Sequence, residues 1–392
     1  MTSPPVASKT ELKKKVKSEA LIDKLRRQLI AAGGKLSFAK FMEIALYTPE
    51  LGYYMNSLPK FGAHGDFITA PELSPLFSQA LAAQSAQIIT MLSDASIIEF
   101  GAGSGIMAVN ILLHLEKLKC LPEHYYIIEI SPYLRKQQRQ TLQRECPHLL
   151  DKVIWLDAMP SDKLKAVVLA NEVLDAMPVE QFTIKNGEFL QRFVTENNDQ
   201  LSLLEQPVEN TELMQALRHL QAEGIEFTDG YTSEINLNIS TWLSNINASL
   251  QQGVILLIDY GYARQEYYHP QRDTGTLQCH YQHRVHSDPL QLIGKQDITA
   301  HVDFTAVAEA AVELNLQVLG FILQSLFLLN NDLLSLAEAI PMDETRRLQQ
   351  SQQIKQLTLP SEMGELFKIL ALGKNIDFSL QGFMTQDILH QL

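Results

Sequence analysis

Apolar positions along the chain fall into short, nearly continuous runs separated by segments with helical spacing. The runs are rich in β-branched residues and cover residues 97–100, 125–130, 153–157, 166–172 and 253–260. Strands that are buried on both faces give continuous apolar runs of this kind, whereas half-buried strands alternate. The pattern therefore predicts an α/β fold with a mostly parallel sheet and helices on both of its faces.

The first 92 residues show helical spacing instead. Apolar positions predict helices over residues 10–32, 37–47 and 73–92, with Gly33 and Gly34 ending the first helix and Ser37 as the N-cap of the second. Residues 51–72 have no clear period and are rich in glycine, aromatic and hydroxyl side chains. Long loops in compact domains are often functional, so we expect this stretch to cover a site, although an ordinary surface loop can have the same composition.

An insertion separates the fourth and fifth predicted strands, at about residues 179–250. Asn186 and Gly187 lie between two alternating runs, which predicts a β-hairpin, and residues 201–204 could add a strand. Residues 262–301 are rich in histidine, tyrosine, glutamine and aspartate, which is more typical of a loop lining a site than of a core element. Strands are also expected near residues 316–323 and 367–372.

Length and charge restrict the possible functions. With 392 residues the chain exceeds the usual size of a single core, so we expect one large α/β domain with additions, or two domains. The formal net charge of −13 argues against general nucleic-acid binding and is compatible with a cationic substrate. No apolar run reaches the roughly 18 residues needed to span a bilayer, so no membrane segment is expected.

The three cysteines, Cys120, Cys146 and Cys279, are too few and too scattered for a disulfide framework or a zinc site. We expect no bound metal, and a reducing cytoplasm is the simplest interpretation. No secretory signal is apparent at the N-terminus. The Lys-rich residues 9–27 contain interspersed acids, which transit peptides avoid, so an amphipathic helix is the preferred interpretation.

Three glycines at alternate positions, Gly101, Gly103 and Gly105, follow the first predicted strand and precede a helix. Glycine lets a ligand approach the backbone closely, and the helix N-terminus offers free N–H groups. Dinucleotide sites use the spacing Gly-x-Gly-x-x-Gly, which differs from the spacing here. Glu99, just before the glycines, would repel a pyrophosphate but suits the cationic amino-acid end of S-adenosylmethionine.

Two more acids end the next two strands. Glu129 lies where a carboxylate can accept hydrogen bonds from two ribose hydroxyls, and Asp157 could accept one from the adenine amino group. Ligands of open α/β sheets bind at the carboxyl edge, so three acids there support a nucleoside-type cofactor more strongly than the glycines alone. The simpler alternative is that these acids only cap helices.

The fourth strand ends in Asn171 and Glu172, followed by Asp175. If a helical turn follows, the two carboxylates share a face and could hold a guanidinium and accept its proton. Alternatively, Asn171 is only an N-cap and the acids favour the helix dipole.

Several motifs resemble the MidA-like methyltransferase family, which includes the mitochondrial complex I assembly-factor arginine methyltransferase. The matching segments are residues 51–54, 65–72, 99–105, 171–178 and 296–304. The resemblance implies a seven-stranded, Rossmann-like class I methyltransferase core with S-adenosylmethionine as methyl donor. It also implies methylation of an arginine ω-nitrogen in a protein.

The same resemblance assigns roles to residues. Asp66, Phe67 and Thr69 would close over the methionine end of the cofactor. Asn171, Glu172 and Asp175 would face the substrate, with Asn171 also next to the cofactor. Asp297, Thr299, His301 and Asp303 would line the opposite wall, where His301 is either catalytic or a hydrogen-bonded structural residue.

The expected organisation is an N-terminal helical region with the covering loop at residues 1–92 and a methyltransferase core at 93–392. We expect a protein substrate, which in this family could be a respiratory-complex subunit, in the cytoplasm of a bacterium or the mitochondrion of a eukaryote. The hairpin insertion could pair two subunits. The alternatives are a small-molecule O- or N-methyltransferase, and a non-catalytic assembly factor that retains the pocket; the glycine spacing disfavours a dehydrogenase.

Overall fold

The main sheet of the protein has seven strands in the order β4-β3-β2-β5-β10-β16-β15. In this computed structural model, which describes residues 9–58, 60, 69–339 and 343–392, their bounds are as follows: β2 Ser96–Phe100, β3 Tyr125–Ile128, β4 Val153–Leu156, β5 Leu164–Asn171, β10 Leu250–Tyr262, β15 Gln317–Leu323 and β16 Phe367–Lys374. The five neighbouring strands β4, β3, β2, β5 and β10 are parallel to one another, and β16 is antiparallel to both β10 and β15. The predicted mostly parallel, seven-stranded sheet is confirmed; the two-residue strand β14 (Val302–Asp303) also pairs with β10.

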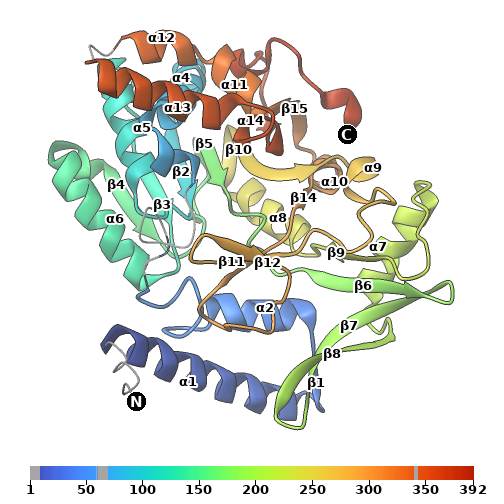
Figure 1. The fold of residues 1–392 in the computed structure, drawn as a ribbon. Helices are drawn as coiled ribbons and strands as arrows, with labels where there is room; N and C mark the ends of the chain where they lie inside the picture. The colour runs from blue at the N-terminus through green and yellow to red at the C-terminus, as the bar shows by residue number, and fades with distance from the viewer. Residues whose placement is uncertain (1–8, 59, 61–68, 340–342) are drawn as a thin grey trace.

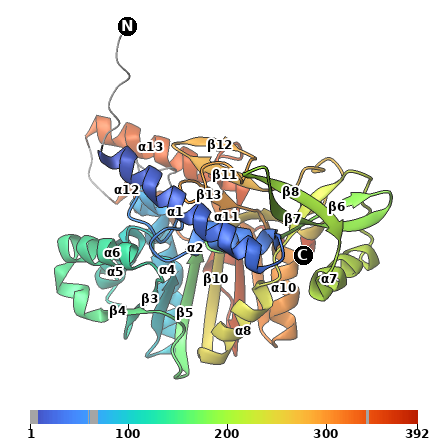
Figure 2. The ribbon, with the colours of Figure 1, turned by 90° about the horizontal axis from the view of Figure 1, so that it is seen from below.

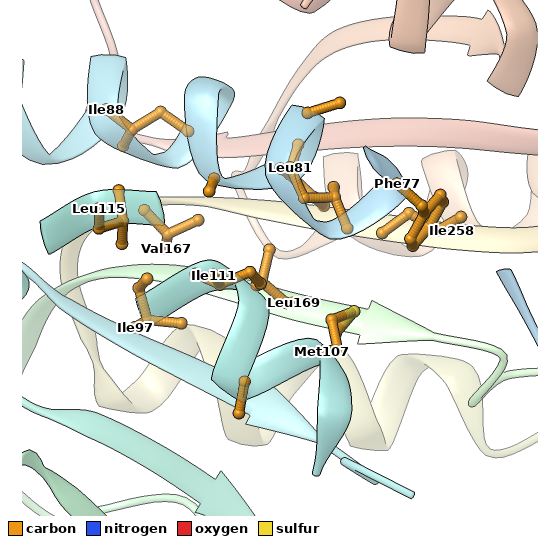
Figure 3. Close-up of a cluster of buried hydrophobic side chains, with 14 of the residues drawn as sticks. Phe77, Leu81, Ile88, Ile97, Met107, Ile111, Leu115, Val167, Leu169 and Ile258 are labelled. Carbon is orange, nitrogen blue, oxygen red and sulfur yellow. The ribbon is translucent and has the colours of Figure 1, made fainter. Parts of the chain in front are cut away.

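Helices cover both faces of this sheet, because consecutive strand residues point into different cores. Ile97 and Val167 join one buried cluster, whereas their neighbours Ile98 and Val168 join another. The first cluster includes α4 (Pro75–Leu92) and α5 (Ile106–Lys117), whose apolar side chains pack on β2, β5 and β10 (Figure 3). The second includes α8 (Ile239–Ser249) and α10 (Phe304–Glu313).

The helix predicted over residues 73–92 is instead two helices, α3 (Ala70–Leu73) and α4. Ser74 has extended backbone angles between them, with φ −154° and ψ 136°. The residue before a proline is disfavoured in the helical region, and Pro75 begins α4. The Ser74 hydroxyl then accepts a hydrogen bond from the N–H of Leu76. The chain therefore changes direction immediately before the helix that packs on the sheet.

A second, antiparallel sheet joins the N-terminus to the insertion. Its path is β1-β7-β6-β9, with β8 on β7; the bounds are β1 Lys35–Ser37, β6 Glu180–Lys185, β7 Glu188–Asn197, β8 Gln200–Pro207 and β9 Thr232–Ile235. The predicted hairpin is confirmed: Asn186 and Gly187 connect β6 to β7 with φ of 54° and 76°, which suits a tight two-residue turn. The pairing of β1 with β7 was not predicted, since nothing in a three-residue segment specifies a partner about 160 positions away.

The N-terminal helices pack with this second sheet. The helices α1 (Lys9–Ala31) and α2 (Phe38–Tyr47) form a separate buried cluster with Val194 of β7 and Ile298. In Figure 1 they lie below the main sheet, and Figure 2 shows them crossing it. By contrast, α4 packs in the core of the main sheet. The expected domain boundary near residue 92, directly after α4, stays a prediction.

The remaining elements surround these two sheets. A small sheet in the order β12-β11-β13 follows the long strand β10 and contacts α2. Its bounds and those of the remaining helices are β11 Gln278–Tyr281, β12 Arg284–His286, β13 Asp297–Thr299, α6 Pro132–Glu145, α7 Thr211–Ala222, α9 Arg264–Tyr267, α11 Gln324–Asn330, α12 Leu333–Glu338, α13 Glu344–Thr358 and α14 Met363–Leu366. No helix in the described part of the chain combines the length and apolar character needed to cross a membrane.

Candidate active site

A cavity of about 1320 Å³ lies at the carboxyl ends of β2, β3, β5 and β10. Segments from the N-terminal region, the sheet edge and the small three-stranded sheet all line it. Small-molecule sites usually measure about 300–1,000 Å³. The cavity therefore has room for more than one ligand, as a transfer reaction between two molecules requires.

The glycine turn forms one wall of the cavity. Gly101 and Gly103 line it and have positive φ angles of 60° and 53°, which glycine adopts without the steric cost of a side chain. Gly105 does not line the cavity. It is the N-cap of α5 with φ 86°, and a Cβ there would lie 3.0 Å from the Cα of Gln138. Gly105 thus allows α5 to pack against α6 behind the turn.

Glu99 is buried at the cavity and accepts a hydrogen bond from the hydroxyl of Tyr125 at 2.7 Å. Burial raises the pKa of its carboxyl to about 8, despite that hydrogen bond. A buried carboxylate is stabilised in its charged form by a nearby cation. Glu99 is therefore suited to bind the ammonium group of an amino-acid moiety. The glycines beside it let that ligand approach the backbone closely.

Glu129 and Asp157 lie further along the same edge. One carboxylate oxygen of Glu129 accepts the N–H of Ser131 and the other accepts the side-chain amide of Gln138, both at 2.9 Å. These bonds fix the carboxylate at the cavity wall, and each oxygen keeps a second lone pair for a hydroxyl donor. Asp157 lines the outer part of the cavity, where its exposed carboxylate is paired with Arg135 at 2.7 Å.

The N-terminal region contributes its own side chains to this wall. Thr69 and Glu72 line the cavity, and the hydroxyl of Ser104 in the glycine turn donates to the carboxylate of Glu72. The contact joins α3 directly to the turn after β2. Asp66 and Phe67 lie outside the described residues.

The side of the cavity that the sequence assigned to the acceptor, called the acceptor side below, starts at the end of β5, where Asn171, Glu172 and Asp175 all line the cavity. No helical turn follows β5, so the condition for a shared helix face is not met: β6 is the next regular element, and Glu172 has φ 53° in an irregular turn. Asn171 is therefore not an N-cap; its amide donates to Glu172 at 3.1 Å, and its buried oxygen accepts no bond from a described residue. The two carboxylates reach the same site through this irregular turn.

Asp259 holds that turn in place. It is fully buried in β10, and its Oδ2 accepts the backbone N–H groups of Leu174 at 3.0 Å and Asp175 at 3.3 Å. The sequence analysis missed this residue, although the signal was available: Asp259 also lies near the end of an apolar strand run. Burial and the nearby Asp175 and Glu172 carboxylates raise the pKa of Asp259 well above its usual value.

Four carboxylates therefore gather here, with Asp297 as the fourth. Tyr260 donates its hydroxyl to Asp175, and Tyr54 donates to Asp297 at 2.7 Å. Burial is the largest cause of the raised pKa of Glu172, about 8, and of Asp175, about 6. None of the groups that shift the pKa of Glu172, Asp175 or Asp259 is a cation. The arrangement suits a cationic ligand.

His301 and Asp303 have different surroundings. His301 lines the cavity between Tyr260 and Tyr262, with ring centroids 5.1 and 5.3 Å away. Burial, with Arg272 and other cations, lowers the pKa of His301 to about 4, so its ring is neutral near pH 7. The expectation for Asp303 is wrong: it lies outside the main cavity, caps α10 and pairs with Arg264 at 3.5 Å.

Aromatic residues that the sequence analysis did not single out complete the acceptor side. Tyr47 and Tyr54 stack with centroids 5.6 Å apart, and Tyr47 donates to the carbonyl oxygen of Ala176 at 2.8 Å. Tyr262 and Trp242 also line the cavity. Tyr54 lies in one of the matching motifs, but an aromatic side chain in a motif is equally compatible with packing, so its sequence alone gave no role.

Comparisons with known proteins agree with this geometry. The sequence profile of a family described as "Putative S-adenosyl-L-methionine-dependent methyltransferase" matches residues 80–322. A crystal structure of a Burkholderia thailandensis protein bound to S-adenosyl-homocysteine is 38% identical and superimposes with a TM-score of 0.93, each chain covered completely. A second structure from that organism gives 0.89 at the same identity and coverage. The fold is therefore the class I methyltransferase fold.

More distant relatives carry a more specific name. A Drosophila melanogaster protein named protein arginine methyltransferase NDUFAF7 homolog, mitochondrial, is 28% identical, over 90% of this chain and 84% of its own. The Homo sapiens protein of the corresponding name is 26% identical, over 88% and 81%. The profile match spans more than half of the chain, and the cavity fits the cofactor. The chain belongs to this family of S-adenosyl-L-methionine-dependent methyltransferases.

Proposed function

We propose that the protein methylates an ω-nitrogen of an arginine side chain in another protein. The observation that carries this proposal is the group of buried carboxylates around Glu172 and Asp175, whose pKa values are raised by burial and by one another. A buried anionic group of this kind is costly unless a cation joins it. Guanidinium is a planar cation with several donors, so it can bond two carboxylates at once.

S-adenosylmethionine supplies an activated methyl group on a sulfonium, and the residues that would hold it are Gly101, Gly103, Glu99 and Glu129. The chain's remaining task is to orient the acceptor and to exclude water. Glu172 and Asp175 orient the guanidinium by accepting its N–H groups. Asp259 fixes the turn that carries them, through the amides of Leu174 and Asp175.

The transferred methyl group leaves the product nitrogen with a surplus proton. A bound guanidinium favours the ionised forms of Glu172 and Asp175. Because their pKa values are raised, to about 8 and about 6, either carboxylate can accept the proton that the methylated nitrogen releases near neutral pH. His301 is neutral and lies edge-to-face with Tyr260, which donates to Asp175. We propose that His301 forms the aromatic wall and that the carboxylates hold the proton.

Names of the relatives support a protein acceptor, because those proteins are called protein arginine methyltransferases. From the family resemblance we expect a respiratory-complex subunit as the acceptor. An O-methyltransferase that acts on a neutral hydroxyl would not need a group of carboxylates beside the acceptor, so the acid cluster disfavours that alternative; a small-molecule amine is distinguished by the labelling experiment below. A non-catalytic assembly factor would not turn over the cofactor.

The test is a labelling experiment with the purified full-length chain. The protein and S-adenosylmethionine carrying a labelled methyl group are added to a lysate of cells that lack the protein. Mass spectrometry then identifies the labelled polypeptide and residue. We expect one dominant protein labelled on arginine. Label on a small molecule or on another residue type, or cofactor that is not consumed, contradicts the proposal.

A further inference from the structure

Two cationic side chains, Arg272 and Lys368, contact the ring of Tyr262, which lines the cavity. The guanidinium of Arg272 lies 4.1 Å from the centroid of the Tyr262 ring, and the ammonium of Lys368 lies 4.8 Å from it. Arg272 and Tyr262 both line the cavity, and Lys368 lies next to the lining residue Phe367. This part of the site is therefore positively charged, in contrast to the group of carboxylates around Glu172 and Asp175.

The hydrogen bonds of both cations go to backbone carbonyl oxygens, and the carboxylates of Glu266 and Glu365 also stabilise the charged form of Lys368. Arg272 donates to the carbonyl oxygen of Glu266 at 3.4 Å, and Lys368 donates to the carbonyl oxygens of Glu365 and Leu366 at 2.9 and 3.4 Å. Neither forms an ion pair within the described part of the chain. A half-buried guanidinium at a cavity wall with free donors can form a bidentate, charge-assisted contact with a carboxylate.

The cations do not serve to neutralise the acids of the site. Neither Arg272 nor Lys368 is among the groups that shift the pKa of Glu172 or Asp175. Both instead lower the pKa of His301, after burial as the largest cause. Tyr260, His301 and Tyr262 form a continuous aromatic wall between the two charged regions, with centroid spacings of 5.1 and 5.3 Å.

We infer that this basic side, Arg272 with Lys368 behind Tyr262, binds an acidic residue next to the target arginine of the protein substrate. The inference rests on the proposed function. With the arginine side chain against the carboxylates, the peptide around it lies along the aromatic wall, and a neighbouring glutamate or aspartate reaches Arg272. The site thus selects a sequence in which positive and negative side chains are adjacent, which matches its own two charges.

The test uses three matched peptides with one arginine flanked on both sides by glutamate, by glutamine or by lysine. Binding to the full-length protein saturated with S-adenosyl-homocysteine is measured by calorimetry, and methyl transfer is measured in parallel. One charge-assisted contact corresponds to roughly tenfold in affinity, so we expect the glutamate peptide to bind about tenfold more tightly than the glutamine peptide. The lysine peptide should bind most weakly.

Variants assign the preference to the residue. Arg272→Gln should abolish the difference between the glutamate and glutamine peptides, Arg272→Lys should keep part of it, and Arg272→Glu should favour the lysine peptide. Arg284→Gln, on the exposed strand β12, should preserve the wild-type order. Cofactor affinity, measured for each variant, reports whether the fold is intact.

The two proposals fail in different ways. If all three peptides bind or react equally well, the inference about the acidic neighbour is wrong and arginine methylation stands. If no arginine peptide is methylated, and the arginine peptides bind no better than the same peptides with citrulline in place of arginine, the proposed function itself is contradicted. If Arg284→Gln removes the preference as fully as Arg272→Gln, the assignment to this cavity wall is wrong.

Discussion

The two halves of the cavity are built in different ways. The cofactor half comes from a short stretch of sequence, because Glu99, the glycine turn, Glu129 and Asp157 follow one another along β2, β3 and β4. The acceptor half is assembled from distant segments: α2, the turn after β5, the end of β10 and the strand β13. Local sequence specifies the first half, and long-range packing specifies the second.

The difference extends to the charges. In the cofactor half Glu129 has two hydrogen-bond donors and Glu99 has one, each fixed by a neighbouring element. In the acceptor half several carboxylates lie close together. The pKa of Asp259 is raised mainly by burial and then by the carboxylates of Asp175 and Glu172. Both halves hold an electrostatic cost that a cation relieves, because burial raises the pKa of Glu99 and of Glu172 to about 8. The acceptor half holds more of it, because neighbouring carboxylates also raise the pKa of Glu172 and of Asp259. Four predictions test this comparison.

The largest effect is expected for Glu172→Gln. The bound guanidinium favours the ionised form of Glu172, and the substitution keeps the shape of the side chain but removes that charge, so methyl transfer should fall by about 100-fold, the size of a strong charge-assisted contact. Cofactor affinity should stay within about twofold, because Glu172 belongs to the other half. Initial rates and calorimetry measure the two quantities. Glu188→Gln, on the exposed hairpin, is the matched control and should change neither quantity. If Glu172→Gln weakened cofactor binding as strongly as it slowed methyl transfer, the division into halves would be contradicted.

A smaller effect is expected for Glu129→Gln. Its amide group would place a donor next to Gln138 or Ser131 and would bond ribose hydroxyls less well, so cofactor affinity should fall about tenfold. Glu123→Gln, at the opposite end of β3, should change nothing. Calorimetric titration with S-adenosyl-homocysteine compares the two variants. Tight binding by Glu129→Gln would remove Glu129 from the cofactor site.

Stability should depend on pH through the same acids. The pKa of Glu172 is about 8 in the folded protein, against a usual value of 4.5, so the folded state holds more protons between those values. The free energy of unfolding of the ligand-free protein should therefore fall as pH rises through this window, by at most about 1.4 kcal/mol per pH unit for this group. Urea titrations from pH 5 to 8.5 measure the slope.

The Glu172→Gln variant provides the control for this pH dependence. Its slope should be smaller than that of the wild type over the same window, because one of the titrating groups is gone. Identical slopes would mean that Glu172 is ionised in the folded protein. The acceptor half would then not hold the electrostatic cost described above.

The smallest effect is expected for Asp157→Asn. Its side chain is 89% exposed and paired with Arg135, and exposed pairs contribute about 0–1 kcal/mol. Cofactor affinity should drop by no more than about fivefold, less than for Glu129→Gln. A larger loss, measured by the same titration, would show that Asp157 contacts the adenine directly, as the sequence suggested.

The sequence predicted most of the regular elements, with particular exceptions. Apolar runs located five parallel strands within a few residues, and Asn186-Gly187 located the hairpin, because both signals are local. Ser74 was assigned to a helix although Pro75 follows it, a local signal that the apolar period outweighed. The pairing of β1 with β7 had no local signal, since both strands are short of distinctive residues and lie far apart in the chain.

The candidate site shows the same division between local sequence signals and long-range contacts. The sequence by itself predicted the cofactor half: the glycine spacing and the acids at successive strand ends follow from two consecutive βαβ units, in which the carboxyl ends of neighbouring parallel strands must meet. The sequence also named Glu172 and Asp175 for the acceptor half, but only the tertiary structure decided how its distant segments meet. Only folding brings Asp259 under the turn of Glu172, Tyr54 onto Asp297, and Arg272 onto the ring of Tyr262, while Asp303 lies outside the main cavity. Contacts between segments that are distant in the sequence, 243 residues for Tyr54 and Asp297, depend on how the layers pack, and no local pattern encodes that.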